Sequence, residues 1–176
     1  MNVYFDFINQ DCVFEDQSAS NMGGVSVVIN GTSCHAEEVM ASYHLHGLDC
    51  VNHLKGLFSF ILFDHHEKRL LAVRDKLGVF PMYYSQLPTG VQFASELAAI
   101  LPKIAYPAIR PHELAQPIRH NYPIELQRTW IEQIMRLRAG EYAVVDKDGL
   151  RLHTDFLSQV FQILFLPDKN FPREYR

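Results

Sequence analysis

Long apolar runs are missing from this chain, and no segment approaches the roughly 20 apolar residues that a membrane-spanning helix needs. Positive charge is not concentrated either, because the net charge is −4 and no stripe of Lys and Arg stands out. The N-terminus has no positive region followed by an apolar core, so it does not resemble a secretory signal. We therefore expect a cytoplasmic protein that binds neither membrane nor nucleic acid.

Cysteine is scarce as well. The chain has three cysteines without C-x-x-C spacing, namely Cys12, Cys34 and Cys50. An odd number of cysteines without a secretory signal favours reduced thiols over a disulfide framework. The histidines do not indicate a metal site: His44 and His46 would point about 200° apart on a helix, and His65-His66 lie in a charged turn. We expect no metal site in this chain.

The composition is that of an ordinary globular domain. The 176 residues are 48% hydrophobic and 20% charged, and the chain is long enough to bury a substantial core. Two β-hairpins are expected between Leu57 and Glu96, because apolar runs alternate there with polar turns. Their four strands are expected at Leu57–Phe63, Arg69–Arg74, Pro81–Ser85 and Val91–Ser95. Apolar residues that face both ways predict a central sheet inside a layered sandwich.

The remaining elements are shorter. Strands are expected at Asn2–Ile8, Val25–Ile29 and 138–145, with a returning strand at Leu150–His153. Helices are expected from Ala36 up to the stop at Gly47, at Asp49–Lys55 and at Glu96–Leu101. Asn9–Gly24 is polar and predicts a loop. The spacing of Trp130, Ile134 and Leu137 fits a helix, and an extended segment is the alternative. The apolar run Phe156–Leu166 fits a helix that packs on the sheet or on a partner.

Three short motifs follow one another in the middle of the chain. They are Leu54–Phe60 (LKGLFSF), Arg74–Tyr84 (RDKLGVFPMYY) and Phe93–Glu96 (FASE). In order and in spacing they resemble the patterns L-x-G-x-F-x-F, R-D-x-x-G-x-x-P-L-Y-Y and F-A-S-E. These patterns belong to the amidotransferase-like N-terminal domain of asparagine synthetases, β-lactam synthetases and lasso-peptide cyclases. The resemblance implies an α+β fold, a shortened N-terminal nucleophile hydrolase: a four-layer αββα sandwich of mainly antiparallel sheets.

The resemblance also implies a chemistry that this chain does not match. Glutaminases of this kind attack glutamine with a cysteine at the mature N-terminus, whose own α-amino group acts as the base. Here Asn2 stands at the nucleophile position, and a carboxamide is not a nucleophile. Cys12 could take the role only after cleavage before it, which would discard the first strand. We expect no glutaminase activity; a divergent amidotransferase that uses processed Cys12, or a nucleophile supplied elsewhere, is the alternative.

The residues that would hold glutamine are also altered. Asn30-Gly31-Thr32 keeps two residues of the family's N-G-E segment, with Thr32 in place of the carboxylate. Ala36 stands at the position of an aspartate, and no arginine precedes Arg69, so the usual carboxylate clamp has no donor. The connection from Gly31 to Glu38 is also shorter than in typical asparagine synthetases. Asn30 and Gly31 therefore resemble a remnant of a substrate-binding segment.

A further set of motif residues has two interpretations. It consists of Arg74, Asp75, Gly78, Pro81, Ser95 and Glu96. In one interpretation these residues shape the face that docks on an ATP-using synthetase domain. In the other, Arg74 and Asp75 cap a strand and satisfy loop backbone groups, while Gly78 and Pro81 set the turn.

The family's synthetase half binds ATP through an S-G-G-x-D-S loop, which this sequence does not contain. ATP and Mg²⁺ are therefore expected only in a partner synthetase domain or chain. We expect residues 1–155 to form the amidotransferase-like domain, with 156–176 as an apolar tail that begins a synthetase domain or docks on one. The leading hypothesis is a catalytically inactive domain with a structural role, or one that presents a peptide or small-molecule substrate, in an amide-bond-forming enzyme. A free-standing binding or regulatory protein on the same scaffold is the other alternative.

Overall fold

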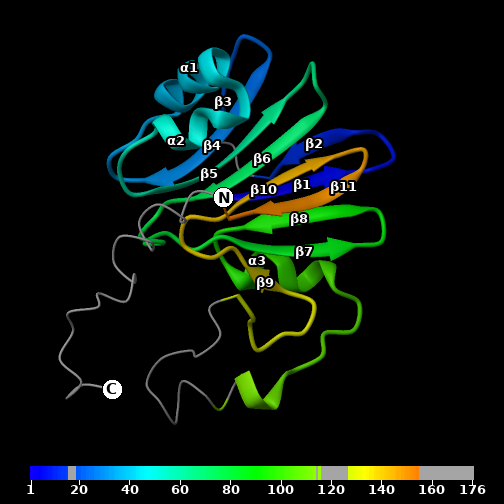
Figure 1. Ribbon diagram of the computed structural model, residues 1–176. Helices are drawn as coiled ribbons and strands as arrows, with labels where there is room; N and C mark the ends of the chain where they lie inside the picture. Colours follow the sequence, from blue (N-terminus) through cyan, green and yellow to red (C-terminus); the bar gives the residue numbers. More distant parts are fainter. Residues whose placement is uncertain (16–18, 114, 116–126, 155–176) are drawn as a thin grey trace, which may run out of the picture.

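The computed structural model describes residues 1–15, 19–113, 115 and 127–154, and it arranges them around two antiparallel sheets (Figure 1). Sheet A has the strand order β2-β1-β8-β7-β9, and sheet B has the order β11-β10-β6-β5-β4-β3. The strands of sheet A are β1 (Asn2–Asp6), β2 (Asp11–Phe14), β7 (Tyr83–Leu87), β8 (Gly90–Ala94) and β9 (Met135–Arg136). The strands of sheet B are β3 (Ser20–Met22), β4 (Val25–Gly31), β5 (Phe58–Asp64), β6 (Arg69–Arg74), β10 (Tyr142–Asp146) and β11 (Gly149–His153).

The two sheets pack face to face through one apolar layer. Phe5 of β1 and Phe63 of β5 meet there edge to face, with their ring centroids 6.0 Å apart. Phe93 of β8 and Ile61 of β5 are fully buried in the same layer. Because side chains alternate along a strand, every second residue of β5 faces sheet A and the others face away from it. All seven residues of β5 are buried, so this strand is covered on both faces, as its sequence predicts.

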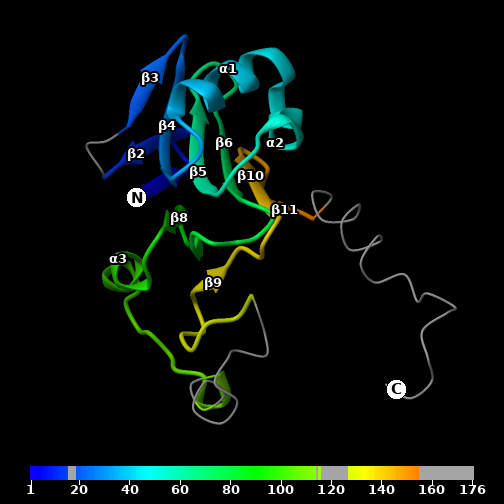
Figure 2. The same cartoon turned by 90° about the vertical axis from the view of Figure 1, so that its left-hand side faces the viewer.

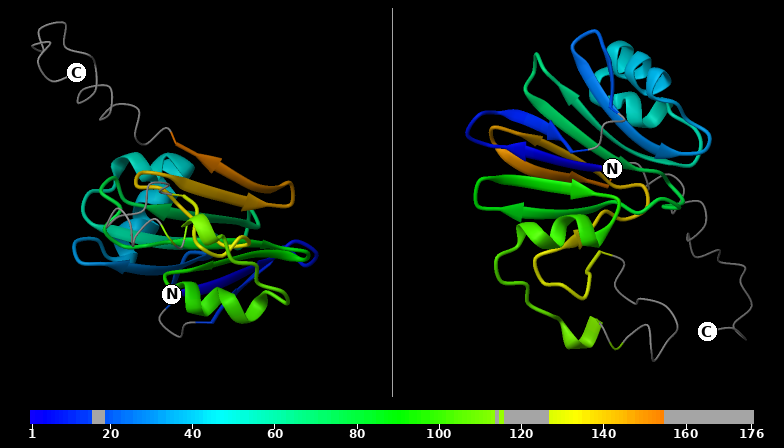
Figure 3. Two further views of the ribbon diagram at one scale, coloured as in Figure 1. Left: turned by 90° about the horizontal axis from the view of Figure 1, so that it is seen from below. Right: turned by 180° about the vertical axis from the view of Figure 1, so that it is seen from behind.

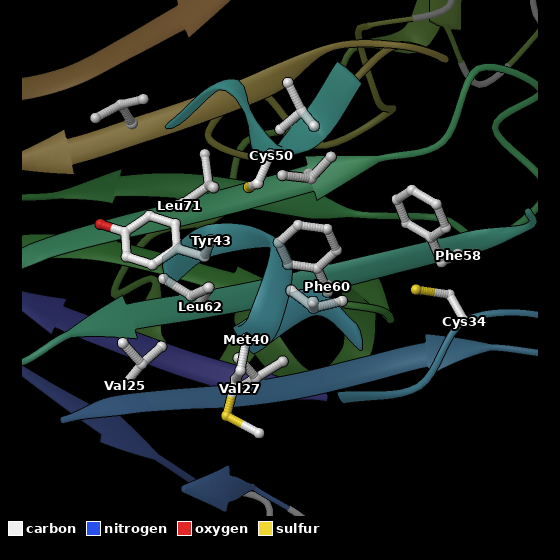
Figure 4. Close-up of a cluster of buried hydrophobic side chains, with 14 residues drawn as sticks. Val25, Val27, Cys34, Met40, Tyr43, Cys50, Phe58, Phe60, Leu62 and Leu71 are labelled. Carbon is white, nitrogen blue, oxygen red and sulfur yellow. The ribbon is translucent and has the colours of Figure 1, made fainter. Parts of the chain in front are cut away.

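Helices α1 (Ala36–His46) and α2 (Cys50–His53) cover the outer face of sheet B (Figures 1 and 2). Figure 4 shows Met40 and Tyr43 of α1 among the side chains of the sheet, next to Phe60 and Leu62. The buried Tyr43 hydroxyl donates a 2.9 Å hydrogen bond to Asp64 at the end of β5. This bond gives the hydroxyl the partner that a buried polar group requires. Gly47 ends α1 with a φ of 60°, as expected from the sequence.

A short helix, α3 (Leu97–Ile100), covers the outer face of sheet A and continues into a 3₁₀ turn at Leu101–Lys103 (Figure 1). Ile100 packs there against Ala94 of β8 and against Ile131 and Ile134. The order of layers is therefore helix, sheet, sheet, helix. This confirms the expected α+β sandwich, with an outer layer on sheet A that is only a few residues long.

Two expectations about local structure are wrong. The polar segment Asn9–Gly24 is not a plain loop, because it contains β2 and β3, which pair with β1 and β4. Both are short edge strands: β2 packs Cys12 and Phe14 against the inter-sheet layer, and β3 is the more polar of the two. The two central hairpins also lie in different sheets, β5–β6 in sheet B and β7–β8 in sheet A.

The alternatives for residues 130–137 are also decided. The segment is extended at β9, and Leu137 donates its backbone N–H to the carbonyl of Met82 at 2.9 Å. The expected helix at Phe156–Leu166 lies outside the described residues. None of the helices that the structure describes is long and apolar enough to traverse a bilayer. Cys12, Cys34 and Cys50 are free thiols.

Candidate functional site

The family motifs gather at one end of the sandwich. Strand β6 ends there at Arg74, β8 ends there at Ala94, and β1 begins there at Asn2 (Figure 3). Hydrogen bonds link the segments across this end: the Arg74 side chain bonds the carbonyl of Leu137, and Ser95 donates its N–H to the carbonyl of Met1 at 3.0 Å. The fold thus brings the motifs together with the start of the chain, 94 residues before Ser95.

Arg74 is the centre of this end. Its guanidinium donates three hydrogen bonds to backbone carbonyls: Phe80 O at 2.9 Å, Leu137 O at 2.6 Å and Gly78 O. Burial lowers the pKa of Arg74, and the nearby Arg136 lowers it further. The side chain therefore holds together the turn that follows β6 and the strand approach at Leu137.

Asp75 holds the same turn from the other side. Its carboxylate accepts backbone N–H groups from Leu77 at 2.7 Å, from Gly78 at 2.8 Å and from Phe58 at 3.3 Å. Gly78 has a φ of +63°, and a Cβ there would lie 2.8 Å from the Cβ of Ala139. Only glycine fits this backbone and this contact without strain. The local interpretation of Arg74, Asp75 and Gly78 agrees with these contacts.

Pro81 completes the turn. It is half-buried and separates Phe80, whose carbonyl bonds Arg74, from the fully buried Met82. Its fixed φ leads the chain from the turn toward β7. Whether the motif residues also shape a docking face stays a prediction at this point.

Asn2 is held as a structural side chain. Its carboxamide donates to Glu15 at 2.5 Å and accepts a hydrogen bond from Gln92, a fully buried residue of β8. The hydroxyl of the half-buried Ser95 lies 3.4 Å from the nitrogen of Met1. Glu96 is exposed and precedes α3 without a side-chain capping bond. Both polar atoms of the Asn2 amide are therefore engaged in hydrogen bonds within the fold.

Asn30 and Gly31 are the last two residues of β4, at the same end of the sandwich. Asn30 pairs with Ser59 of β5, which in turn pairs with Arg74 of β6, so the three residues form one row across sheet B. The row lies two residues along the strands from Val28, Ile61 and Ala72 of the inter-sheet layer, on the same face of the sheet, and therefore faces sheet A. Within the described part of the chain, the buried Ser59 hydroxyl has no hydrogen-bond partner.

The positions expected to grip glutamine carry no charge. Thr32 is exposed, and its hydroxyl lies 3.4 Å from that of Ser33. Ala36 is the first residue of α1 and has no polar side-chain atom. A Cβ at Gly31 would lie 2.8 Å from the carbonyl of Leu57, so this glycine permits the close approach of β4 and β5. Gly31 thus serves the pairing of the two strands, and neither Thr32 nor Ala36 has a charged group that could pair with an ammonium or a carboxylate.

Cys12 lies away from this end. It is in β2 opposite Phe5, which is three residues along β1 from Asn2, and it packs against the layer between the sheets. Burial raises the pKa of its thiol well above the ordinary range, and Asp11 raises it further. A protonated, packed thiol is a poor nucleophile. The geometry therefore opposes a catalytic role for Cys12.

A pocket of about 210 Å³ opens between two of the motifs. It is lined by Leu54, Lys55, Gly56, Phe58, Asp75, Lys76 and Leu77. The sequence motifs indicated these residues individually, but only the pairing of β5 with β6 makes them neighbours.

A second polar contact was not expected from the sequence. At the other end of β4, the Ser26 hydroxyl and the Nε2 atom of His65 lie 2.6 Å apart, beside a cavity of about 480 Å³. His65 is exposed in its charged turn, and its ring also contacts the Ser26 hydroxyl. The residues are 39 positions apart, so no local pattern could have revealed the contact.

Comparison with known proteins identifies the class of the fold. A family model described as "Glutamine amidotransferase domain" matches residues 27–156, and the chain belongs to this family. It is 32% identical to glutamine-hydrolyzing asparagine synthetase 3 of Bacillus subtilis over 120 residues, which are 66% of this chain and 19% of that protein. It is 31% identical to the amidase chyE of Penicillium rubens over 132 residues, 74% of this chain and 18% of that protein.

The particular domain is an asparagine synthetase-like glutamine amidotransferase domain. A solved glutamine phosphoribosylpyrophosphate amidotransferase of B. subtilis aligns with 76% of this chain and 30% of its own, at 13% identity and a TM-score of 0.49. The chain spans about a fifth of the length of the curated relatives it matches.

Proposed function

We propose that this domain does not hydrolyse glutamine and is the structural or substrate-presenting part of an ATP-dependent amide-bond-forming enzyme. The enzyme would be of the asparagine synthetase-like type, as in lasso-peptide cyclases or β-lactam synthetases. In such enzymes an amine of the substrate replaces ammonia as the nucleophile, so a glutaminase is not needed. The domain would act in the cytoplasm on a peptide or a small molecule.

One observation carries the proposal: Asn2, at the position of the nucleophile, presents a carboxamide that is hydrogen-bonded to Glu15 and Gln92. The family's carboxylate clamp is an arginine upstream of the N-G-E segment, and no arginine precedes Arg69 in this chain. Thr32 and Ala36 supply no acid that could receive the substrate's ammonium group. The motif end is therefore suited to support a structure and is poorly suited to grip glutamine.

The activating chemistry belongs to the partner in this proposal. A synthetase domain or chain with an S-G-G-x-D-S loop would bind ATP and Mg²⁺ and adenylate a carboxylate. The similarity to an asparagine synthetase, of which this chain matches only 19%, supports such a partner.

Glutamine hydrolysis by the purified protein tests the proposal directly. We expect no glutamate release above the uncatalysed rate, with or without ATP, and no adduct at Cys12 from an electrophilic glutamine analogue. The reason is the raised pKa of the packed Cys12 thiol, together with the hydrogen-bonded amide of Asn2. Coupled glutamate detection and intact-protein mass spectrometry provide the measurements.

The Cys12→Ser variant is the matched control, because the substitution removes the thiol and nearly preserves its size. Glutamate release by the natural chain that this variant abolishes would refute the proposal and establish the divergent amidotransferase instead.

A further inference from the structure

Ser26 and His65 form a polar pair at the end of the sandwich opposite the motifs. Ser26 is the second residue of β4 and pairs across sheet B with Phe63 of β5. His65 directly follows β5, and its Nε2 atom lies 2.6 Å from the Oγ atom of Ser26. In the neutral tautomer that carries its proton on Nδ1, the Nε2 atom accepts the hydrogen of the serine hydroxyl. This is the arrangement in which a histidine can act as the base for a serine nucleophile.

The core beneath His65 holds its ring in place. The rings of Phe63 and His65 meet edge to face, with their centroids 4.8 Å apart and an angle of 74° between their planes. Phe63 is fully buried and contacts Phe5 of sheet A. The backbone N–H of His65 also donates a 3.0 Å hydrogen bond to the carbonyl of Gly24. Two contacts that do not involve the Ser26 hydroxyl therefore position the histidine.

A cavity lies beside the pair. Ser26 is only 5% exposed, but it and His65 both line the cavity of about 480 Å³, together with the side chains of Phe14 and Ala19. Phe14 belongs to β2 of sheet A and Ser26 belongs to β4 of sheet B, so the cavity lies between the edges of the two sheets. Its volume falls within the range of roughly 300–1,000 Å³ that is typical of small-molecule sites.

The chemistry of the lining indicates a class of substrate. Phe14 and Ala19 offer apolar surface to an acyl chain, and the Ser26–His65 pair supplies a nucleophile and a base. An activated ester has a leaving group, such as a phenolate, that departs without receiving a proton. A nucleophile and a base are therefore sufficient to cleave an ester of this kind.

We propose that Ser26 and His65 form a nucleophilic site that transfers the acyl group of a small activated ester to water. The Ser26 Oγ atom forms a bond to the carbonyl carbon, and its proton passes to Nε2 of His65. The bond from this carbon to the leaving oxygen breaks, and the leaving phenolate keeps the electron pair. Solvent then removes the proton from His65. Water attacks the acyl-serine, His65 takes a proton from the water and returns it to Ser26, and the carboxylic acid is released.

Labelling of the complete natural protein with a fluorophosphonate tests the site. This reagent forms a stable phosphorus–oxygen bond with an activated serine and releases fluoride, so the adduct accumulates. We expect peptide mapping by mass spectrometry to place the label on Ser26. The yield should fall at least about tenfold in His65→Gln, because the serine loses its base.

Hydrolysis of p-nitrophenyl butyrate provides the second measurement. Ser26→Ala and His65→Gln should each lower the release of p-nitrophenol at least about tenfold, whereas the matched controls His66→Gln and Ser33→Ala should change it by less than about twofold. His66 is the exposed neighbour of His65 in the same turn, and Ser33 is an exposed serine whose hydroxyl lies 3.4 Å from that of Thr32. Urea denaturation of each variant verifies that it is folded.

Three results would overturn the site: no label on Ser26, a label on Ser26 that is unchanged in His65→Gln, or equal rates of p-nitrophenol release in all four variants. The labelling of the natural protein does not depend on whether any variant folds. The inference is separate from the proposed function, because the pair lies at the other end of β4 from the motifs. Failure of the Ser26 site leaves the proposed function standing, and glutamate release that depends on Cys12 would remove the proposed function without affecting the Ser26 site.

Discussion

Two segments at the same end of the sandwich differ in how the fold uses them. The turn from Arg74 to Pro81 is held by an arginine and an aspartate that together accept or donate six hydrogen bonds to backbone groups. The segment from Thr32 to Ala36 is mostly exposed and makes few side-chain contacts. Both correspond to family motifs, but only the first resembles its motif closely.

This difference between the two segments distinguishes residues that stabilise the fold from residues that would bind a substrate. Residues that satisfy buried backbone groups are costly to replace, because each orphaned carbonyl or N–H loses a hydrogen bond that water cannot restore. Residues that grip a substrate stabilise nothing in its absence. A domain that has no glutamine to bind can therefore hold its Arg74 turn and lack an acid at Thr32 and Ala36.

Of the substitutions that test this comparison, replacement of Arg74 should cause the largest loss of stability. Arg74→Met keeps the apolar stem and removes all three hydrogen bonds to carbonyls. We expect the free energy of unfolding to fall by about 3–4 kcal/mol, because buried carbonyls lose charged donors. Urea denaturation measures this change in the free energy of unfolding.

Two further variants control for charge. Arg74→Lys should recover less than half of the loss, since an ammonium group lacks the planar fork. Arg151→Met removes an exposed arginine that pairs with Asp146 and should cost about 0.5 kcal/mol or less. If Arg74→Met lowers the free energy of unfolding no more than Arg151→Met does, the stability of the turn does not depend on the Arg74 guanidinium.

Gly78→Ala should have the next largest effect. The substitution strains a φ of +63° and places a Cβ 2.8 Å from Ala139 and 3.1 Å from the guanidinium carbon of Arg74. We expect a loss of about 2–3 kcal/mol in the free energy of unfolding, from backbone strain and overpacking together. Gly47→Ala is the control, because Gly47 has a φ of +60° with open space around it, and it should cost about 1 kcal/mol. Equal losses would show that packing against Ala139 contributes nothing.

Asp64 extends the comparison to the pH dependence of the free energy of unfolding, and its expected effect is the smallest of the three. Its carboxylate caps the turn after β5 much as Asp75 caps the turn after β6, by accepting the N–H groups of His66 and Glu67. Burial favours the neutral acid, but the Glu67 amide, the Tyr43 hydroxyl and the His66 amide outweigh it and hold the pKa of Asp64 below its ordinary value. Ionised Asp64 therefore stabilises the fold above about pH 4, and this contribution is lost as the pH falls through the lowered pKa.

The measurement compares Asp64→Asn with the natural chain in urea between pH 3 and pH 7. We expect the variant to be about 1–2 kcal/mol less stable at pH 7 and the difference to shrink below pH 4. Asp148→Asn, at an exposed hairpin position, should show no such trend. A difference that stays constant over the whole range would contradict the assignment.

Much of the fold could be predicted from local patterns. The buried run of β5, the turn residues between β7 and β8, and the glycine stop at Gly47 each depend on neighbours in the sequence. The short edge strands β2 and β3 were not predicted in this way, because three or four residues are too few to show a clear pattern of alternation. The contact between Ser26 and His65 was missed for the same reason.

By itself, the sequence determined that Asn2, Thr32 and Ala36 carry no nucleophilic or charged side chain, because the chemistry of a residue does not depend on the fold; their place at glutaminase positions stays a prediction. It also left two roles open for Arg74 and its neighbours. Only the tertiary structure decided that the Arg74 guanidinium bonds a distant carbonyl as well as two carbonyls of its own turn, because Leu137 lies 63 residues away in the sequence. The exposure of Leu77 beside a pocket was likewise a tertiary outcome, since it depends on where the turn lies and not on which residues form it.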